Sequence, residues 1–176
     1  AKEAGLPLYK YIGAYRDHLP VYASGNFHGT VQEYVDEALY YKEKGIGGYK
    51  AHPSGPVEFD LEVHQAVRDA VGPDYVLMSD PVGEYTMGDA VRVGRQLEKL
   101  GYKWFEEPFR DFELYKYQEL CRTLVIPIAG TETTRGCHLG FAQVIAQRAA
   151  DIFRESLCWD DRHARMPAVL SLAQAC

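Results

Sequence analysis

Short apolar segments alternate with amphipathic stretches along most of the chain. Six runs rich in apolar, β-branched or aromatic residues predict strands, and six stretches that follow them have the period of amphipathic helices. The predicted strands are Val21–Gly25, Gly48–His52, Tyr75–Asp80, Tyr102–Glu107, Pro127–Glu132 and Asp151–Arg154, and the predicted helices lie at about 31–44, 58–71, 86–100, 112–123, 137–147 and 164–175. The pattern therefore predicts six consecutive βα units.

The stretch after the first predicted strand carries the clearest helix signals. Val31, Val35 and Ala38 follow the i, i+4, i+7 spacing of one buried face. Thr30 is a candidate N-cap, and Gly45 terminates the pattern. Because helices of this length separate the strands, we expect parallel strands joined by right-handed crossovers.

Two parallel architectures compete, an open doubly wound sheet and a closed (β/α)8 TIM-type barrel. A dinucleotide-binding sheet needs a GxGxxG turn after its first strand, and residues 25–29 read GNFHG. The barrel is therefore favoured. A complete barrel needs about 250 residues, so we expect a barrel truncated to about six βα units, a fragment of a longer gene product. Residues 1–20 would lead into the barrel and residues 21–176 would form its catalytic domain.

Composition narrows the classes of partner. The net charge of −6 provides no basic surface for nucleic acids or anionic membranes. No apolar run approaches the roughly 20 residues of a membrane span. The four cysteines lie far apart without a CxxC pair, and no signal-peptide pattern is present. We expect a cytoplasmic protein whose partner is a small molecule.

Three acidic residues end three successive predicted strands. Asp80, Glu106 and Glu132 recur at intervals of 26 residues, which predicts neighbouring positions on the rim where barrel enzymes hold their active sites. A single acid at a strand end is more often a helix cap or an ion-pair partner. Three crowded carboxylates, however, repel one another unless a cation neutralises them. Their hard oxygen atoms predict a Mg²⁺ site.

Two basic groups end the strand before these acids. Lys50 and His52 are spaced i, i+2, so both point to one face of the strand. Lys50 can hold a substrate carboxylate, and His52 can accept a proton near neutral pH. The alternative is that Lys50 only balances the acidic rim and that His52 is a structural loop residue. Three polar residues near the end of the first strand are weaker candidates for binding a hydroxylated substrate: Ser24, Asn26 and His28.

The order of these motifs resembles the mandelate racemase and muconate lactonizing branch of the enolase superfamily. The resemblance rests on KAH at 50–52, WFEEP at 104–108 and IPIAGTE at 126–132, together with Asp80. It implies that Asp80, Glu106 and Glu132 bind Mg²⁺, and of the two glutamates before the proline the family uses the first. It also implies that Lys50 lies beside the substrate carboxylate and that His52 replaces the catalytic lysine as the base that removes the α-proton.

The resemblance implies an enzyme that abstracts the α-proton of a small carboxylate through an enolate intermediate. A lyase that dehydrates a sugar acid to a 2-keto acid is the leading hypothesis, and a racemase or epimerase is the nearest alternative. A non-catalytic remnant that binds metal at most is the alternative from another class. The full-length form is expected to be a homo-oligomer.

The chain departs from the family pattern at the second and sixth strands. His52 stands where the family has a lysine, and Ser156 aligns with an aspartate that normally orients a histidine of the seventh strand. By the same comparison, two further βα units and the N-terminal capping domain would lie outside this sequence. These departures favour the remnant, whereas the retained basic pair and acid triad favour the enzyme.

Overall fold

The chain forms a parallel sheet backed by helices. The computed structural model describes residues 1–11, 13, 16, 18–83, 85–132 and 137–154. Its strands are β1 (Ala23–Ser24), β2 (Gly48–Ala51), β3 (Val76–Ser79), β4 (Phe105–Glu106), β5 (Ile128–Gly130) and β6 (Ile152–Phe153). Its helices are α1 (Leu8–Tyr11), α2 (Val31–Glu43), α3 (Val57–Val71), α4 (Met87–Lys99), α5 (Leu114–Thr123) and α6 (Cys137–Gln147).

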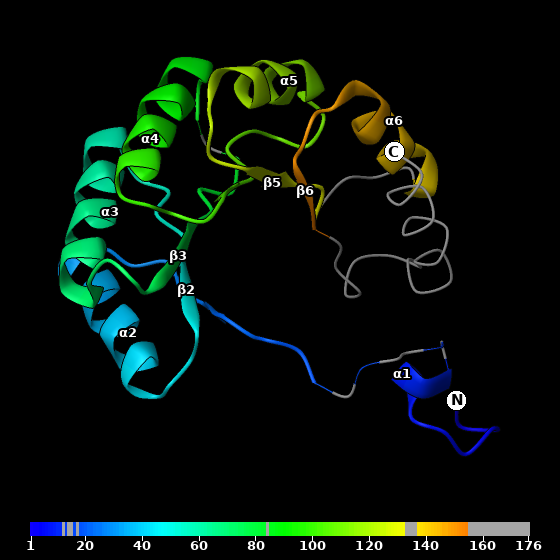
Figure 1. Cartoon of the computed structure of the whole chain (residues 1–176). Coiled ribbons are helices and arrows are strands. Elements are labelled where there is room, and N and C mark those ends of the chain that lie inside the picture. Colours follow the sequence, from blue (N-terminus) through cyan, green and yellow to red (C-terminus); the bar gives the residue numbers. More distant parts are fainter. Residues whose placement is uncertain (12, 14–15, 17, 84, 133–136, 155–176) are drawn as a thin grey trace.

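The order of the strands distinguishes the two architectures. The sheet runs β1-β2-β3-β4-β5-β6, and every strand is parallel to its neighbour. A doubly wound sheet would reverse this order at a switch point. Figure 1 shows the strands on the inside of an arc and helices α2 to α6 on its outside. This is the wall of a (β/α) barrel, as the sequence predicted.

The strands are shorter than their predicted segments, most clearly at β4. The backbone N–H of Tyr102 donates to the carbonyl of Leu97 at 3.0 Å, so this residue completes the end of α4 before the chain enters the sheet. Inter-strand hydrogen bonds nevertheless reach the acidic rim. The N–H groups of Asp80, Glu107 and Arg154 each donate to a carbonyl of a neighbouring strand, at 2.9, 2.9 and 2.8 Å. The backbone that carries the rim is therefore fixed by the sheet.

The predicted N-cap of α2 is confirmed as a capping box. The hydroxyl of Thr30 accepts from the backbone N–H of Glu33 at 3.3 Å, and the Glu33 carboxylate accepts from the Thr30 N–H at 2.9 Å. Together these bonds satisfy two N–H groups that a helix start leaves unpaired. The capping box fixes the point at which the chain leaves the loop after β1.

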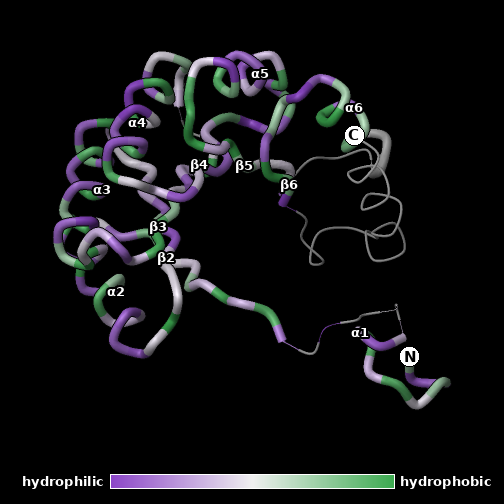
Figure 2. The backbone as a smooth tube through the Cα atoms, viewed as in Figure 1, coloured by the Kyte–Doolittle hydropathy of each residue, from purple (hydrophilic) through white to green (hydrophobic). Residues whose placement is uncertain are grey.

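Register divides the strand residues between two faces. Tyr49 pairs with Leu77, and Phe105 pairs with Ile128; these side chains are buried with those of the helices in one apolar cluster. Helix residues in that cluster include Ala38, Val63, Val67, Val93, Leu97, Leu120 and Val144. Figure 2 shows the matching alternation of polar and apolar residues along α3 and α4. The core between sheet and helices holds the strand ends in place.

The N-terminal segment lies apart from this core. Figure 1 shows α1 set away from the arc of helices, and Leu8 and Tyr11 within it are exposed. The sequence did not predict this short helix. The division into residues 1–20 and 21–176 stays a prediction, and the predicted helix at 164–175 lies outside the described residues. No helix in the described part is long and apolar enough to cross a bilayer.

Candidate active site

Lys50 joins the first two acids of the predicted triad. Its side chain, 1% exposed, donates from Nζ to Asp80 Oδ2 at 2.8 Å and to Glu106 Oε1 at 2.7 Å. Asp80 and Glu106 are both buried, and Glu106 has no exposed surface. Buried charges are strongly destabilising unless they are paired and hydrogen-bonded. The ammonium group therefore stabilises two carboxylates that come from neighbouring strand ends.

His52 meets the same cluster from the loop after β2. Its Nε2 lies 3.3 Å from Asp80 Oδ2, and its ring stacks at a tilt against Phe27 with centroids 5.5 Å apart. Burial raises the pKa of Asp80, but the hydrogen bond from His52 and the charge of Lys50 outweigh burial and leave this pKa below its ordinary value. Asp80 is therefore held as a carboxylate.

Glu106 has a hydrogen-bonding partner for each of its oxygens. Oε1 accepts from Lys50 and lies 3.0 Å from Nε of Arg154, while Oε2 accepts from the indole Nε1 of Trp104 at 2.9 Å. Trp104 and Glu106 are spaced i, i+2, so both side chains lie on one face of the strand. The buried carboxylate is thus enclosed by three donors, one on β2, one directly before β4 and one directly after β6.

Glu132 reaches the cluster through Arg154, whose guanidinium forms ion pairs with both Glu132 and Glu106. The backbone N–H of Glu132 donates to Glu107 Oε1 at 2.8 Å. Glu107, the second glutamate of the WFEEP segment, therefore helps to fix the backbone directly after β5. Asp80, Glu106 and Glu132 form one continuous chain of charges with Lys50 and Arg154 between them.

The backbone is strained beside each of the three acids. Val82, Glu107 and Thr131 have φ values of 58°, 38° and 87°, in the left-handed region that residues with a Cβ seldom adopt. Each lies within two residues of a member of the triad. Among the described non-glycine residues, one other, Arg148, has a positive φ. Strain of this kind is concentrated at functional sites, which supports a functional role for this rim.

The predicted substrate-binding residues divide into two groups. Ser24 is exposed and pairs in register with Lys50, so it lies on the face of the sheet that carries the cluster. Asn26 Nδ2 donates to Glu37 Oε1 at 2.6 Å, and His28 Nε2 lies 3.0 Å from Glu37 Oε2. These two side chains therefore attach the loop after β1 to α2.

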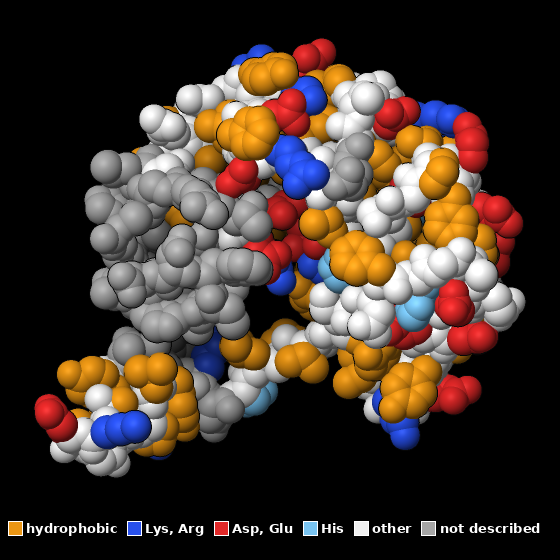
Figure 3. All heavy atoms as spheres, turned by 180° about the vertical axis from the view of Figure 1, so that it is seen from behind, with side chains coloured by type: hydrophobic (Ala, Val, Ile, Leu, Met, Phe, Trp, Pro, Cys, Tyr) orange, Lys and Arg blue, Asp and Glu red, His pale blue; other side chains and the backbone are white. Residues whose placement is uncertain are grey.

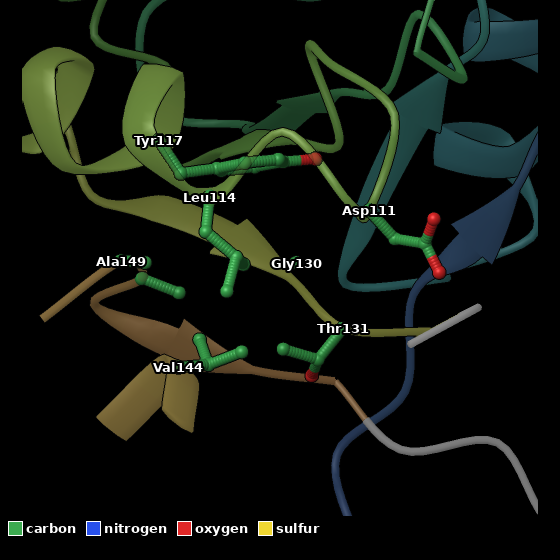
Figure 4. Close-up of a pocket in the computed structure, with 8 residues that line it drawn as sticks. Asp111, Leu114, Tyr117, Gly130, Thr131, Val144 and Ala149 are labelled. Carbon is green, nitrogen blue, oxygen red and sulfur yellow. The ribbon is translucent and has the colours of Figure 1, made fainter. Parts of the chain in front are cut away.

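Two hollows lie near the strand ends. Figure 3 shows acidic and basic side chains meeting in a hollow at the centre of the face opposite to that of Figure 1. A separate, largely apolar pocket of about 220 Å³, including its opening to solvent, lies between β5, α5 and α6. Figure 4 shows Leu114, Tyr117 and Val144 pointing into it, with Thr131 at one side. Ligand pockets usually measure about 300–1,000 Å³, so the charged rim is the better candidate.

Three residues of the rim were missed from the sequence: Trp104, Glu107 and Arg154. The i, i+2 spacing that linked Lys50 with His52 could also have linked Trp104 with Glu106. Arg154 ends the sixth predicted strand as the acids end theirs, which was a usable signal. Glu107 contacts the backbone of Glu132 at the end of the next strand, and its sequence position does not reveal that contact. Ser156 lies outside the described residues.

The donor set fits a hard divalent cation. Carboxylate oxygens are the preferred protein ligands of Mg²⁺, and three of them come from consecutive strand ends. In the described part of the chain, no three or more His, Cys, Asp or Glu side chains surround a common point as metal ligands would. Lys50 and Arg154 neutralise the carboxylates instead. The rim therefore offers suitable ligands for Mg²⁺, but these carboxylates are already paired with Lys50 and Arg154.

Comparison with known proteins assigns the family. The family model described as "Enolase C-terminal domain-like" matches residues 33–176, which is most of the chain. The chain belongs to this family. Arabinonate dehydratase from Saccharolobus solfataricus is 31% identical over 98% of this chain and 47% of its own length. D-galactarolactone cycloisomerase from Agrobacterium fabrum is 33% identical over 92% of this chain and 43% of its own length.

The fold of the chain is similar to that of a solved dehydratase structure. D-glucarate dehydratase from Agrobacterium tumefaciens, crystallised with magnesium, has a TM-score of 0.89 and 36% identity over 96% of this chain and 48% of its own. The chain therefore spans about half the length of these relatives. Membership of this enolase family and the barrel fold are established, and both confirm the expectations from the sequence.

Proposed function

We propose that this chain is the barrel portion of a Mg²⁺-dependent sugar-acid dehydratase that removes an α-proton and a β-hydroxyl to form a 2-keto acid. The observation that carries the proposal is the buried Lys50 bonded to carboxylates from two consecutive strand ends. The similarity to arabinonate and glucarate dehydratases supports the reaction class. It also supports a small carboxylate as the partner.

The proposed roles follow from the positions of the side chains. Asp80, Glu106 and Glu132 would hold Mg²⁺, which when bound supplies positive charge to stabilise the enolate formed after loss of the α-proton. Lys50 provides the buried positive charge for the substrate carboxylate. It is fixed on β2, so it requires little rearrangement when the substrate arrives.

His52 would accept the α-proton. Its Nδ1 is buried and has no hydrogen-bond partner among the described residues, whereas its Nε2 faces Asp80. When Nε2–H donates to Asp80, the free lone pair is on Nδ1. The ring can then take a proton on Nδ1 while Asp80 stabilises the resulting imidazolium. Ser24, on the same face, would contact a hydroxyl of the substrate.

An isomerase is the second candidate, because the chain also resembles D-galactarolactone cycloisomerase. Both reactions begin with removal of a proton next to a carboxyl group, so the residues proposed above serve either. They separate in the overall balance, since the dehydratase releases water, whereas an isomerase returns a product with the same composition as its substrate. The widely spaced cysteines support a cytoplasmic setting, and the family resemblance supports a homo-oligomeric full-length enzyme.

The metal site is tested first, by calorimetric titration of the purified chain with Mg²⁺. We expect saturable binding that is lost when Glu106→Gln and Glu132→Gln are combined, because each change removes a negatively charged ligand. The matched control combines Glu58→Gln and Glu119→Gln, which remove two exposed carboxylates from α3 and α5. Circular dichroism verifies that each variant is folded.

The reaction is tested next, by incubating the Mg²⁺-loaded chain with a panel of sugar acids and measuring 2-keto acids. A product that requires Mg²⁺ and disappears in His52→Gln supports the dehydratase. A product with the same mass as the substrate would favour the second candidate, because the dehydratase product is lighter by one water. Absence of Mg²⁺ binding by the folded wild-type chain would contradict the proposal and favour a non-catalytic remnant.

A further inference from the structure

We propose that Arg154 is an internal counter-ion that competes with the divalent cation for Glu106 and Glu132. In this view its guanidinium must leave the rim before the metal can bind, and it thereby sets the affinity of the metal site. The inference rests on the proposed metal site, and it assigns a role to a residue that the proposed reaction does not use.

The contacts of Glu106 show why Arg154 and a divalent cation cannot bind this carboxylate at the same time. Its Oε1 already has Lys50 at 2.7 Å and Arg154 at 3.0 Å, and its Oε2 accepts from Trp104 at 2.9 Å. A carboxylate has about four lone-pair positions, and a metal ion repels cations in adjacent positions. One of the two cationic partners must therefore move when a divalent cation binds to Glu106.

Burial indicates that Arg154 is the partner that moves. The Lys50 side chain is 1% exposed, whereas that of Arg154 is 30% exposed. Lys50 lies within β2, which is paired with a strand on both sides. Arg154 follows β6, and a long side chain at that position can turn toward solvent without breaking the sheet.

The backbone of Arg154 stays in place when the side chain leaves. Its N–H donates to the carbonyl of Gly130 at 2.8 Å, and its own carbonyl accepts from the hydroxyl of Thr131 at 2.8 Å. Both partners lie on or directly after β5. The movement is thus confined to the side chain, and Arg154 can return to the rim when the metal dissociates.

The charges of the cluster give the direction of the effect. Three carboxylates face two cationic side chains, so removal of Arg154 increases the net negative charge of the rim by one unit. A more negative site attracts Mg²⁺ more strongly, and the ion no longer has to displace an ion-paired side chain. Without metal, the same change leaves the buried Glu106 with one neutralising partner fewer, which destabilises the fold.

The test compares Arg154→Gln with wild type by calorimetry and by thermal unfolding, in chelator and in Mg²⁺. We expect Mg²⁺ to bind at least about tenfold more tightly to the variant, which corresponds to about 1.4 kcal/mol. We also expect the variant to unfold at a lower temperature in chelator and to recover more stability than wild type on addition of Mg²⁺.

Two further variants complete the test. Arg92→Gln is the matched control, since Arg92 forms an exposed ion pair with Glu58 on the helices, and it is expected to bind Mg²⁺ as wild type does. Arg154→Lys retains the charge but not the forked donors, so its affinity is expected to lie between those of wild type and Arg154→Gln.

Unchanged or weaker Mg²⁺ binding by folded Arg154→Gln would overturn the competition and leave the proposed metal site intact. If neither wild type nor Arg154→Gln bound Mg²⁺, both the metal site and the competition would be contradicted. Binding by Arg154→Gln alone would support the competition and would contradict the proposed function of the wild-type chain. The two proposals therefore fail in distinguishable ways.

Discussion

At the scale of single residues, the rim is a balance of buried charges. Lys50 contributes most, because it is buried and contacts two carboxylates that have little access to water. Removal of one member of a buried ion pair costs about 3–5 kcal/mol, since the remaining charge is left without a partner. The charged cluster is therefore important for folding as well as for the proposed chemistry.

Lys50→Met tests this balance. We expect the free energy of unfolding in chelator to fall by about 3 kcal/mol or more, because Asp80 and Glu106 both lose a hydrogen-bonded cation. Urea unfolding followed by circular dichroism measures the change. Lys99→Met, at an exposed position in the last turn of α4, is the control and should change stability by less than about 1 kcal/mol. Equal effects of the two substitutions would contradict a special role for Lys50.

The acids of the rim could be predicted from the sequence, but their cationic partners could be predicted only in part. Asp80, Glu106 and Glu132 stand at a regular interval, and Lys50 stands at the end of a neighbouring strand. Arg154 belongs to no such interval, and its ion pairs depend on side-chain directions. The roles of all five residues in catalysis and metal binding stay predictions.

At the scale of secondary-structure elements, α4 and α5 approach each other closely at a glycine. A Cβ placed on Gly94 would lie 2.2 Å from Cδ1 and 3.3 Å from Cγ of Leu124, and Leu124 is buried directly after α5. A Cβ placed on Gly88, in the first turn of the same helix, would have its nearest neighbour, Thr86 Oγ1, at 4.0 Å. The helix thus contains one glycine required by packing and one that is not.

Gly94→Ala and Gly88→Ala therefore form a matched pair. We expect Gly94→Ala to reduce the free energy of unfolding by about 1–3 kcal/mol, because the new methyl group forces Leu124 to repack. Gly88→Ala should be neutral or stabilising by up to about 1 kcal/mol, because alanine has the higher helix propensity. Chemical denaturation measures both. A Gly94→Ala protein as stable as Gly88→Ala would show that α5 can shift without cost.

The helices were easier to predict than the strands for a physical reason. The period and the Thr30 cap of α2 are local signals, and its predicted and observed bounds agree within one residue. Strand ends depend instead on hydrogen bonds to distant segments. Tyr102 was expected in β4, yet its backbone N–H is used by α4. Sequence periodicity contains no information about that choice.

At the scale of the whole molecule, a buried histidine predicts how the fold responds to acid. His64 on α3 is completely buried, and its Nε2 lies 2.7 Å from the hydroxyl of Ser79 at the end of β3. Burial lowers the pKa of His64 from 6.5 to about 3. The folded protein therefore keeps this ring neutral over a pH range in which the unfolded chain protonates it.

Stability is expected to decrease as the pH falls from about 6.5 toward 3, by up to about 1.4 kcal/mol per pH unit from this group. The sign follows because the unfolded state binds the additional proton. His64→Gln should reduce the slope of the free energy of unfolding between pH 6 and pH 4 by about that amount, whatever its stability at pH 7. Urea titrations at several pH values measure the slope. An unchanged slope would show that His64 is not the group responsible, and His18→Gln, at an exposed position, is the control.

The order of the strands also has a consequence for how the chain reaches its fold. Each strand from β2 to β6 pairs with the strand synthesised just before it. A βα unit that emerges from the ribosome therefore finds the preceding strand already in place, and none of the described strands β2 to β6 has to wait for that partner. Assembly of the described strands can proceed from β1 onward, one unit at a time, and the ion pairs of Arg154 with Glu106 and Glu132 form once β6 has joined β5.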